Sequence, residues 1–178
     1  MSPRTVVGWV LEQTLGRLVR ALHRAQLIRA VHITMSGRAA AIWQATVEEA
    51  EDINSVTGLG LLRQLLGDSD CGLVRFLVAQ GADIGAIRAC MESLAPTADA
   101  HTGYDSALAV LLRRSYEVVP VEAVPGQRDR RQTLHTIHFL WGFVADRSAV
   151  GTALGDACPF AARLSRGSEV WTRWYDAG

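Results

Sequence analysis

Residues 61–68 (LLRQLLGD) decide the predicted fold, because residues 139–146 (FLWGFVAD) repeat their pattern 78 positions later. Both octets carry apolar side chains at their first, second, fifth and sixth positions and an aspartate at their eighth. Apolar residues at this spacing are typical of the buried face of a helix. A pattern that recurs at a fixed offset predicts an internal duplication, which must be weighed before any fold is assigned.

Helical patterns surround both octets. In the first copy we expect helices over residues 38–54, 59–66, 71–80 and 84–94. Ser36 and Thr57 precede two of them as N-cap candidates, and Thr102 and Thr136 precede apolar runs in the second copy. The sequence therefore predicts an all-α protein, in which two tandem pseudo-symmetric four-helix repeats, residues 33–95 and 101–168, form one bundle.

Three segments lie outside this helical pattern. Residues 1–32 show helical spacing over 5–30 and hold five arginines against one glutamate, which predicts an extra N-terminal amphipathic helix. Whether it docks in cis or contacts a partner stays open. Residues 119–132 contain two prolines and a glycine and are expected to form a non-helical loop. Residues 169–178 form an aromatic C-terminal tail, expected to anchor on the core.

The charged residues limit the classes of function. Eighteen arginines balance eighteen acidic residues, so the chain is formally neutral, which argues against a nucleic-acid binder. The sequence has no lysine and a single asparagine, a bias typical of a GC-rich bacterial genome. Without lysine the chain has no Schiff-base lysine and no P-loop lysine.

No pattern in the sequence indicates catalysis, a cofactor or a membrane span. The three cysteines form no CxxC pair and are expected to be buried thiols. His101, His135 and His138 lack a further ligand at a recognisable metal-binding spacing. No apolar run reaches the roughly 18 residues that cross a bilayer, and no signal peptide is recognisable. We therefore expect a cytoplasmic protein that is not an enzyme, has no cofactor and does not bind membranes.

Several stretches resemble the N-terminal repeats of Clp unfoldases. Residues 35–39 (MSGRA) and 48–50 (EEA) resemble the family's first helix, which typically reads F-T-x-R-A…E-E-A. Residues 61–83 resemble the following H-L-L-L-A-L-L-x-D…G-V-D stretch. His101 and Thr102 resemble the Y-T opening of the second repeat, and residues 136–144 (TIHFLWGFV) resemble its T-E-H-x-L-x-G-L-L segment. The resemblance covers about residues 33–165.

The resemblance implies a fold and a function. In that family the Clp N-terminal domain is a pseudo-two-fold bundle of eight helices. It is the substrate- and adaptor-binding head of chaperones such as ClpC and ClpA. Because this chain has no Walker A motif, we expect a stand-alone head without ATPase modules. Its partners would be proteins of the Clp protease system, adaptors, or unfolded or marked substrates, and its role would be the regulation or buffering of ATP-dependent proteolysis.

The resemblance also implies a set of binding residues. Some ClpC-type heads bind phosphoarginine, with hydroxyls and helix N-termini on the phosphate and a glutamate on the guanidinium. Hydroxyls are present here, but the glutamate positions hold Leu59 and Ile137, which predicts apolar pockets. The same hydroxyls are also explained as plain helix caps. The candidate ligand-binding residues are Met35, Ser36, Arg38, Thr57, Leu59, His101, Thr102, Thr136 and Ile137.

Other interpretations stay open. The chain could bind apolar peptides or small molecules such as antibiotics, or be a vestigial Clp head. Residues 141–154 have the spacing of the first homology box of Bcl-2 proteins, which would predict a helical groove. That family does not predict the internal repeat. An enzyme built on the histidine cluster is the remaining alternative.

Overall fold

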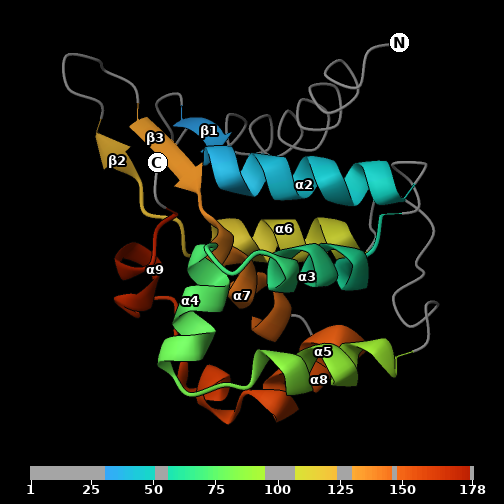
Figure 1. Ribbon diagram of the computed structural model, residues 1–178. Coiled ribbons are helices and arrows are strands. Elements are labelled where there is room, and N and C mark those ends of the chain that lie inside the picture. The colour runs from blue at the N-terminus through green and yellow to red at the C-terminus, as the bar shows by residue number, and fades with distance from the viewer. Residues whose placement is uncertain (1–30, 51–55, 95–106, 124–129, 146–147, 177–178) are drawn as a thin grey trace. The chain divides into compact units, whose positions relative to one another are not determined.

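The computed structural model describes residues 31–50, 56–94, 107–123, 130–145 and 148–176 (Figure 1). The chain divides into two compact units. Residues 1–34 and 120–133 form the smaller unit, and residues 35–119 and 134–178 form the larger one. The described residues are mostly helical, which confirms the helical part of the predicted fold class.

Eight α-helices and one 3-10 helix make up the described part of the larger unit. They are α2 (Gly37–Glu49), α3 (Gly58–Gly67), α4 (Gly72–Ala79), α5 (Ile84–Glu92), α6 (Ala107–Tyr116), α7 (Thr136–Ala145), α8 (Ala149–Ala157), η2 (Pro159–Arg163) and α9 (Val170–Arg173). The predicted helices of the first copy correspond to α2, α3, α4 and α5; α2, α4 and α5 are shorter than their predicted ranges, whereas α3 is not.

Side-chain caps explain where several helices begin. The hydroxyls of Ser36 and Thr57 accept hydrogen bonds from the backbone N–H three residues on, both at 3.1 Å. Asp83 caps α5 and Ser148 caps α8 in the same way. Each bond satisfies an N–H group that has no partner within its own helix. The predicted capping roles of Ser36 and Thr57 are therefore confirmed.

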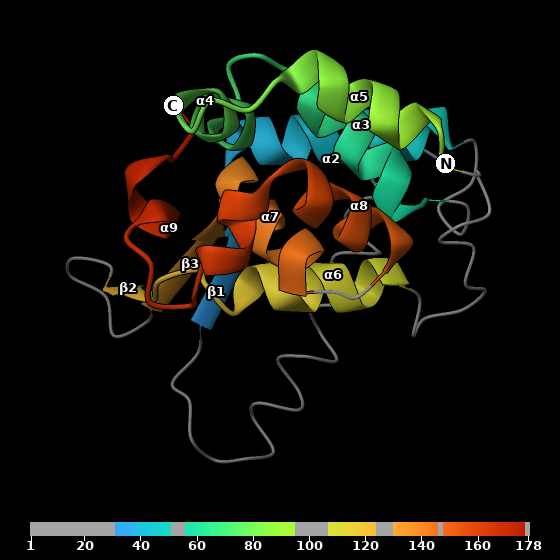
Figure 2. The same ribbon diagram turned by 90° about the horizontal axis from the view of Figure 1, so that it is seen from below.

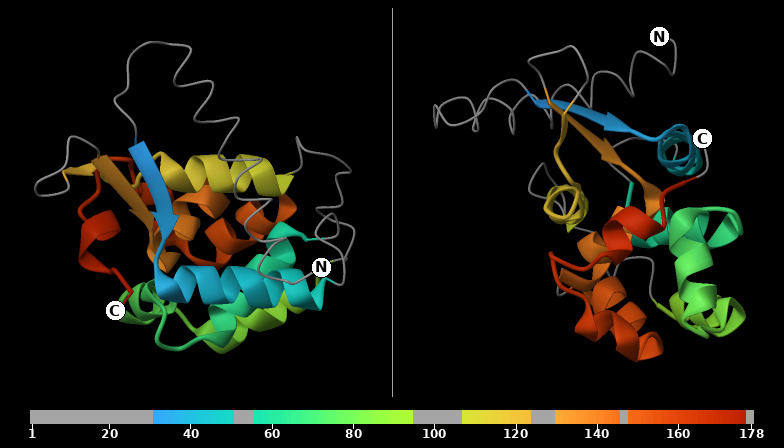
Figure 3. Two further views of the ribbon diagram at one scale, coloured as in Figure 1. Left: turned by 90° about the horizontal axis from the view of Figure 1, so that it is seen from above. Right: turned by 90° about the vertical axis from the view of Figure 1, so that its left-hand side faces the viewer.

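Helix α7 forms the centre of the larger unit. Seven of its ten residues are buried, and it packs against α6, α4, α8 and α9 (Figures 1 and 2). Seen from above, α2 and α6 run in similar directions with part of α7 visible between them (Figure 3). Gly142 allows α6 to approach closely, because a Cβ there would lie 2.7 Å from the carbonyl oxygen of Leu111. The core therefore depends on close contact between α6 and α7.

The first seven residues of the two octets lie on α3 and α7. The four leucines of the first octet are fully buried, as are Phe139, Leu140 and Phe143 of the second. Helix α3 contacts α2, α4, α5 and α6, and α5 in turn packs on α8 (Figure 2). The predicted apolar core positions are confirmed at these residues.

A small sheet corrects the all-α prediction. Strands β1 (Val31–Met35), β2 (Glu122–Ala123) and β3 (Arg130–Leu134) pair in the order β1-β3-β2. β2 and β3 are antiparallel, with Glu122 opposite Arg131. The predicted loop over residues 119–132 is indeed not helical where it is described, but it supplies two strands. β-branched residues in β1 favour a strand, whereas β3 carries little apolar pattern and is defined by its backbone pairing.

Some expectations concern residues outside the described ranges. The predicted N-terminal helix over residues 5–30 is one of them, and the candidate site residues His101 and Thr102 are others. Among the described helices, none has the length and apolarity to cross a membrane. The sequence-based domain boundaries stay a prediction.

Candidate functional site: a carboxylate at three helix N-termini

The carboxylate of Asp176 lies where the first turns of α2, α4 and α7 meet. Its side chain is only 1% exposed. One oxygen accepts from the Ser36 hydroxyl at 2.5 Å and from the Thr136 N–H at 2.9 Å. The other accepts from the Gly72 N–H at 3.1 Å and from the Thr136 hydroxyl. All four donors stand at the start of a helix, so three helix N-termini share one anion.

This arrangement favours negative charge for two physical reasons. The first N–H groups of a helix have no partner inside the helix, and the helix dipole places partial positive charge there. Burial by itself would raise the pKa of Asp176, but contacts with His135, Ser36 and Thr136 outweigh it and hold the pKa well below its usual range. The carboxylate is therefore ionised at neutral pH.

A backbone contact brings two of these helix starts together. The Ser36 N–H donates to the carbonyl oxygen of Leu134 at 2.9 Å, two residues before Thr136. The Thr136 hydroxyl also accepts from the Leu73 N–H at 3.4 Å, which links α7 to α4. The pocket is thus assembled by hydrogen bonds between the three helix starts, in addition to those on Asp176.

Glycine at position 72 makes room for the chain that carries Asp176. A Cβ at Gly72 would lie 2.0 Å from the carbonyl oxygen of Trp174 and 3.3 Å from the Thr136 hydroxyl. No side chain fits at that distance, so the first residue of α4 must be glycine for residue 174 to approach this closely.

An aromatic layer lies beside the carboxylate. The rings of His135 and Tyr175 stack with centroids 3.9 Å apart and planes 7° from parallel. Nδ1 of His135 accepts from the Asp176 backbone N–H at 3.3 Å and lies 3.6 Å from a carboxylate oxygen of the same residue. The segment after α9 is therefore held by its main chain and by two consecutive side chains.

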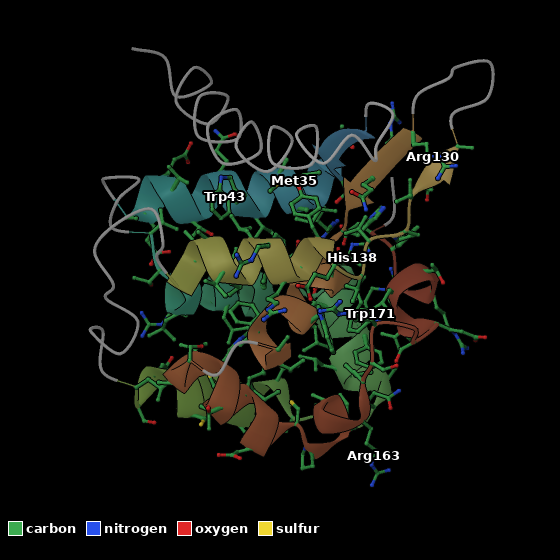
Figure 4. The ribbon with its side chains drawn as sticks, turned by 180° about the vertical axis from the view of Figure 1, so that it is seen from behind. Met35, Trp43, Arg130, His138, Arg163 and Trp171 are labelled. Carbon is green, nitrogen blue, oxygen red and sulfur yellow. The ribbon has the colours of Figure 1, made fainter. Side chains whose placement is uncertain are left out.

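His138 is fully buried next to this layer, close to Trp171 (Figure 4). Its Nδ1 accepts from the His135 N–H at 2.9 Å, in the manner of a capping box, and its Nε2 lies 2.9 Å from the Trp171 carbonyl oxygen. This pairing makes Nε2 the protonated nitrogen of a neutral ring. Burial is the main cause that lowers the pKa of His138 to about 4. The histidine is therefore a neutral structural link between α7 and α9.

Acid should weaken the fold through His138. Between pH 6.5 and about 4 the unfolded chain takes up a proton on this histidine that the folded chain does not, so stability falls as the pH falls. The full loss is about 3 kcal/mol. Denaturant unfolding at a series of pH values measures this slope. His138→Gln keeps an acceptor for the His135 N–H and does not titrate, so it should flatten the slope. An unchanged slope in the variant would assign the acid sensitivity to other groups.

A cavity of about 470 Å³ lies beside Trp174, between α4 and α9. It is lined by Phe76, Ala79, Gln80, Glu169, Val170, Arg173 and Trp174. The Trp174 ring packs edge-on against Phe76 at 5.9 Å, and the guanidinium of Arg75 lies 5.7 Å from the same ring. The cavity therefore continues the surface on which the Asp176 segment rests.

The structure brings together two of the predicted binding residues, Ser36 and Thr136. Thr57 caps α3 and does not touch Asp176. Arg38 binds Asp68 at 2.6 and 2.8 Å. Met35 is half-buried at the end of β1. Among the described residues, the part of the predicted site that comes together is therefore the start of α2 and the start of α7.

Leu59 and Ile137 do not form the apolar pockets expected of them. Leu59 is 3% exposed and Ile137 is fully buried, and neither lines the cavity beside Trp174. Both side chains face the core because their positions belong to the buried faces of α3 and α7. They leave almost no surface for a ligand to contact.

Three residues of the site were missed by the sequence reasoning: Gly72, His135 as a ring partner, and Asp176. The aromatic residues around Asp176 did signal an anchor, and Trp171 is indeed buried at 2% exposure. Nothing local marks Asp176 itself, because its partners are distant in sequence. Glycine at position 72 gave no sign of the close approach either, because Gly37 also begins a helix and a Cβ there would meet no atom within 4 Å.

Within the described ranges, no three His, Cys, Asp or Glu side chains are grouped so as to hold a metal ion. Cys71 and Cys158 are buried and Cys90 is half-buried, and all three are free thiols. Comparison of the chain with protein-family models, with curated proteins and with solved structures finds no match.

Proposed function

We propose that this chain is a non-catalytic protein- or peptide-binding module that resembles the head of Clp unfoldases and regulates or buffers ATP-dependent proteolysis. The observation that carries the proposal is the meeting of Ser36 and Thr136 on one carboxylate. Ser36 belongs to the motif of the first repeat and Thr136 to that of the second. Together with three helix N-termini they make a pocket that receives an acidic group.

The order of the helices supports the tandem-repeat arrangement. Helices α3 and α7 each span ten residues, and their bounds differ by the same 78 positions as the two octets. Each is followed by a shorter helix, α4 or α8, that begins within five residues of its end. We therefore propose two related helical units around the α3 and α7 cores.

The hydrogen bonding supports binding over catalysis. Both Asp176 oxygens are occupied by two donors each, so neither is free to accept a proton from a substrate. Both ring nitrogens of His138 are also engaged. The pocket presents fixed donors, which suits recognition of an anionic group on a protein. The proposed partners are Clp-system proteins, adaptors, or unfolded or marked substrates.

Affinity capture from a lysate of the source organism, read by quantitative mass spectrometry, tests this function. We expect the tagged chain to enrich Clp ATPase subunits, their adaptors or protease substrates. Ser36→Ala and Thr57→Ala form a matched pair, because each removes one helix cap and only Ser36 also touches Asp176. Enrichment should fall with Ser36→Ala and persist with Thr57→Ala. Recovery of no Clp-system protein would overturn the proposed function.

A further inference from the structure

We propose that the segment Trp174–Asp176 is an internal competitor in this pocket, and that the partner it excludes is an acidic peptide with an aromatic residue before the carboxylate. The inference rests on the proposed function, since it names the partner and the regulation of the same site. It follows from how the segment is held, from the shape of the pocket and from the charges around it.

The three residues of the segment bind as consecutive positions of a peptide would. Trp174 packs on Phe76 of α4, Tyr175 stacks on His135 before α7, and Asp176 is held at the helix starts. The named partners lie on or next to α2, α4 and α7, and none lies on α9, the helix that the segment follows. The segment is therefore recognised by a surface built from other parts of the fold.

The pocket also accommodates a peptide main chain. The space that a side chain at position 72 would fill is taken by the Trp174 carbonyl, and the Asp176 N–H is paired with His135. Main-chain contacts of this kind can be made by any extended peptide. The pocket therefore selects a peptide only by the few side chains that it contacts. An acidic peptide from another protein could make the same contacts.

Helix α9 has an anchor that does not depend on the segment. Trp171 anchors α9 by burial and by a 2.7 Å hydrogen bond from its indole N–H to the Ser165 carbonyl. Trp174 and Tyr175 are only half-buried. Release after Arg173 therefore breaks the contacts of three residues and keeps the anchor, as in local unfolding of a chain segment.

The surroundings favour an acidic partner. Arg75 and Arg173 are exposed beside the Trp174 cavity, and neither forms an ion pair within the described residues. Glu169 is the single acidic residue that lines this cavity. A peptide that replaces the segment would place its aromatic residue against Phe76 and its neighbouring residues near these two arginines.

Competition of this kind predicts a measurable gain in affinity when the segment is weakened. A site that is open for only a fraction of the time binds with an affinity reduced by that fraction. The probe is a fluorescein-labelled peptide of residues 174–178 (WYDAG), titrated in fluorescence anisotropy against the full chain. We expect Asp176→Ala to bind it at least tenfold more tightly than the unmodified chain does.

Two controls make the test specific. Asp156→Ala removes an exposed aspartate of α8 and should bind the peptide as the unmodified chain does. When the aspartate of the peptide is replaced by asparagine, most of the difference in affinity between Asp176→Ala and the unmodified chain should disappear. If Asp176→Ala does not fold, Tyr175→Ala removes the stack on His135 and keeps the carboxylate, and a several-fold gain is expected.

Equal affinity of the folded variants and the unmodified chain would overturn the competition, and no binding by any folded variant would overturn the pocket as a peptide site. Neither result affects the lysate capture, which can still recover Clp-system proteins. Conversely, peptide binding without recovery of those proteins would overturn the proposed function and leave the acidic-peptide pocket in place.

Discussion

Replacing Asp176 with alanine is expected to lower the free energy of unfolding by about 3–5 kcal/mol. The substitution leaves the N–H groups of Gly72 and Thr136 and two hydroxyls without their acceptor in a site where the side chain is 1% exposed. Each buried donor without a partner costs roughly 1–3 kcal/mol, and helix starts that share one anion lose it together. The unsatisfied donors, more than the lost side-chain packing, account for the effect.

Denaturant unfolding followed by circular dichroism measures this change. Asp156→Ala is the matched control, since Asp156 is exposed and should change stability by no more than about 0.5 kcal/mol. Asp176→Asn should recover little of the lost free energy of unfolding, because the hydrogens of the new amide would face other hydrogen-bond donors. A loss below about 1 kcal/mol for Asp176→Ala would show that water replaces the carboxylate at little cost.

Substituting Gly72 with alanine should destabilise the chain by about 2–4 kcal/mol, although alanine is the better helix former. The added Cβ would lie 2.0 Å from the Trp174 carbonyl oxygen, so the segment that carries Asp176 must move away from the helix starts. Helix propensity alone would predict a gain of about 1 kcal/mol. The sign of the change therefore separates a close backbone contact from a local helix effect.

Gly37→Ala provides a closely matched control for this experiment. Gly37 is the first residue of α2 as Gly72 is of α4, but a Cβ at position 37 would meet no atom within 4 Å. We expect Gly37→Ala to be neutral or slightly stabilising in the same unfolding assay. Equal effects of the two substitutions would mean that residue 174 does not approach α4 as closely as described.

Much of the helical fold could be predicted from the sequence because helices have local signals. The buried positions of the two octets follow from their spacing, and Ser36 and Thr57 cap helices as expected from their places ahead of apolar runs. The sheet could not be predicted in the same way. Strand β3 pairs through its backbone with β1, which lies about a hundred residues earlier, as well as with the nearby β2. Its side chains carry little of the alternating pattern that marks a strand.

In the site, too, local signals could be predicted from the sequence and tertiary contacts could not. Ser36 and Thr136 were candidates because hydroxyls before helices are recognisable in sequence, but capping explains them equally well when each is taken alone. Leu59 and Ile137 were misplaced because an apolar residue near a helix start can face a ligand or the core, and the sequence does not distinguish the two. Packing of α3 and α7 directs both side chains inward.

The sequence by itself determined the four helices of the first copy, the caps Ser36 and Thr57 and the apolar faces of the two octets, since each depends on residues within one or two turns of each other. Only the tertiary structure decided that Asp176 would bind Ser36, Gly72 and Thr136, which lie 140, 104 and 40 residues away. The N–H groups of Gly72 and Thr136 have no partner inside their own helices and are paired only when the fold brings the Asp176 carboxylate to them. No local pattern specifies which distant residue will supply that acceptor.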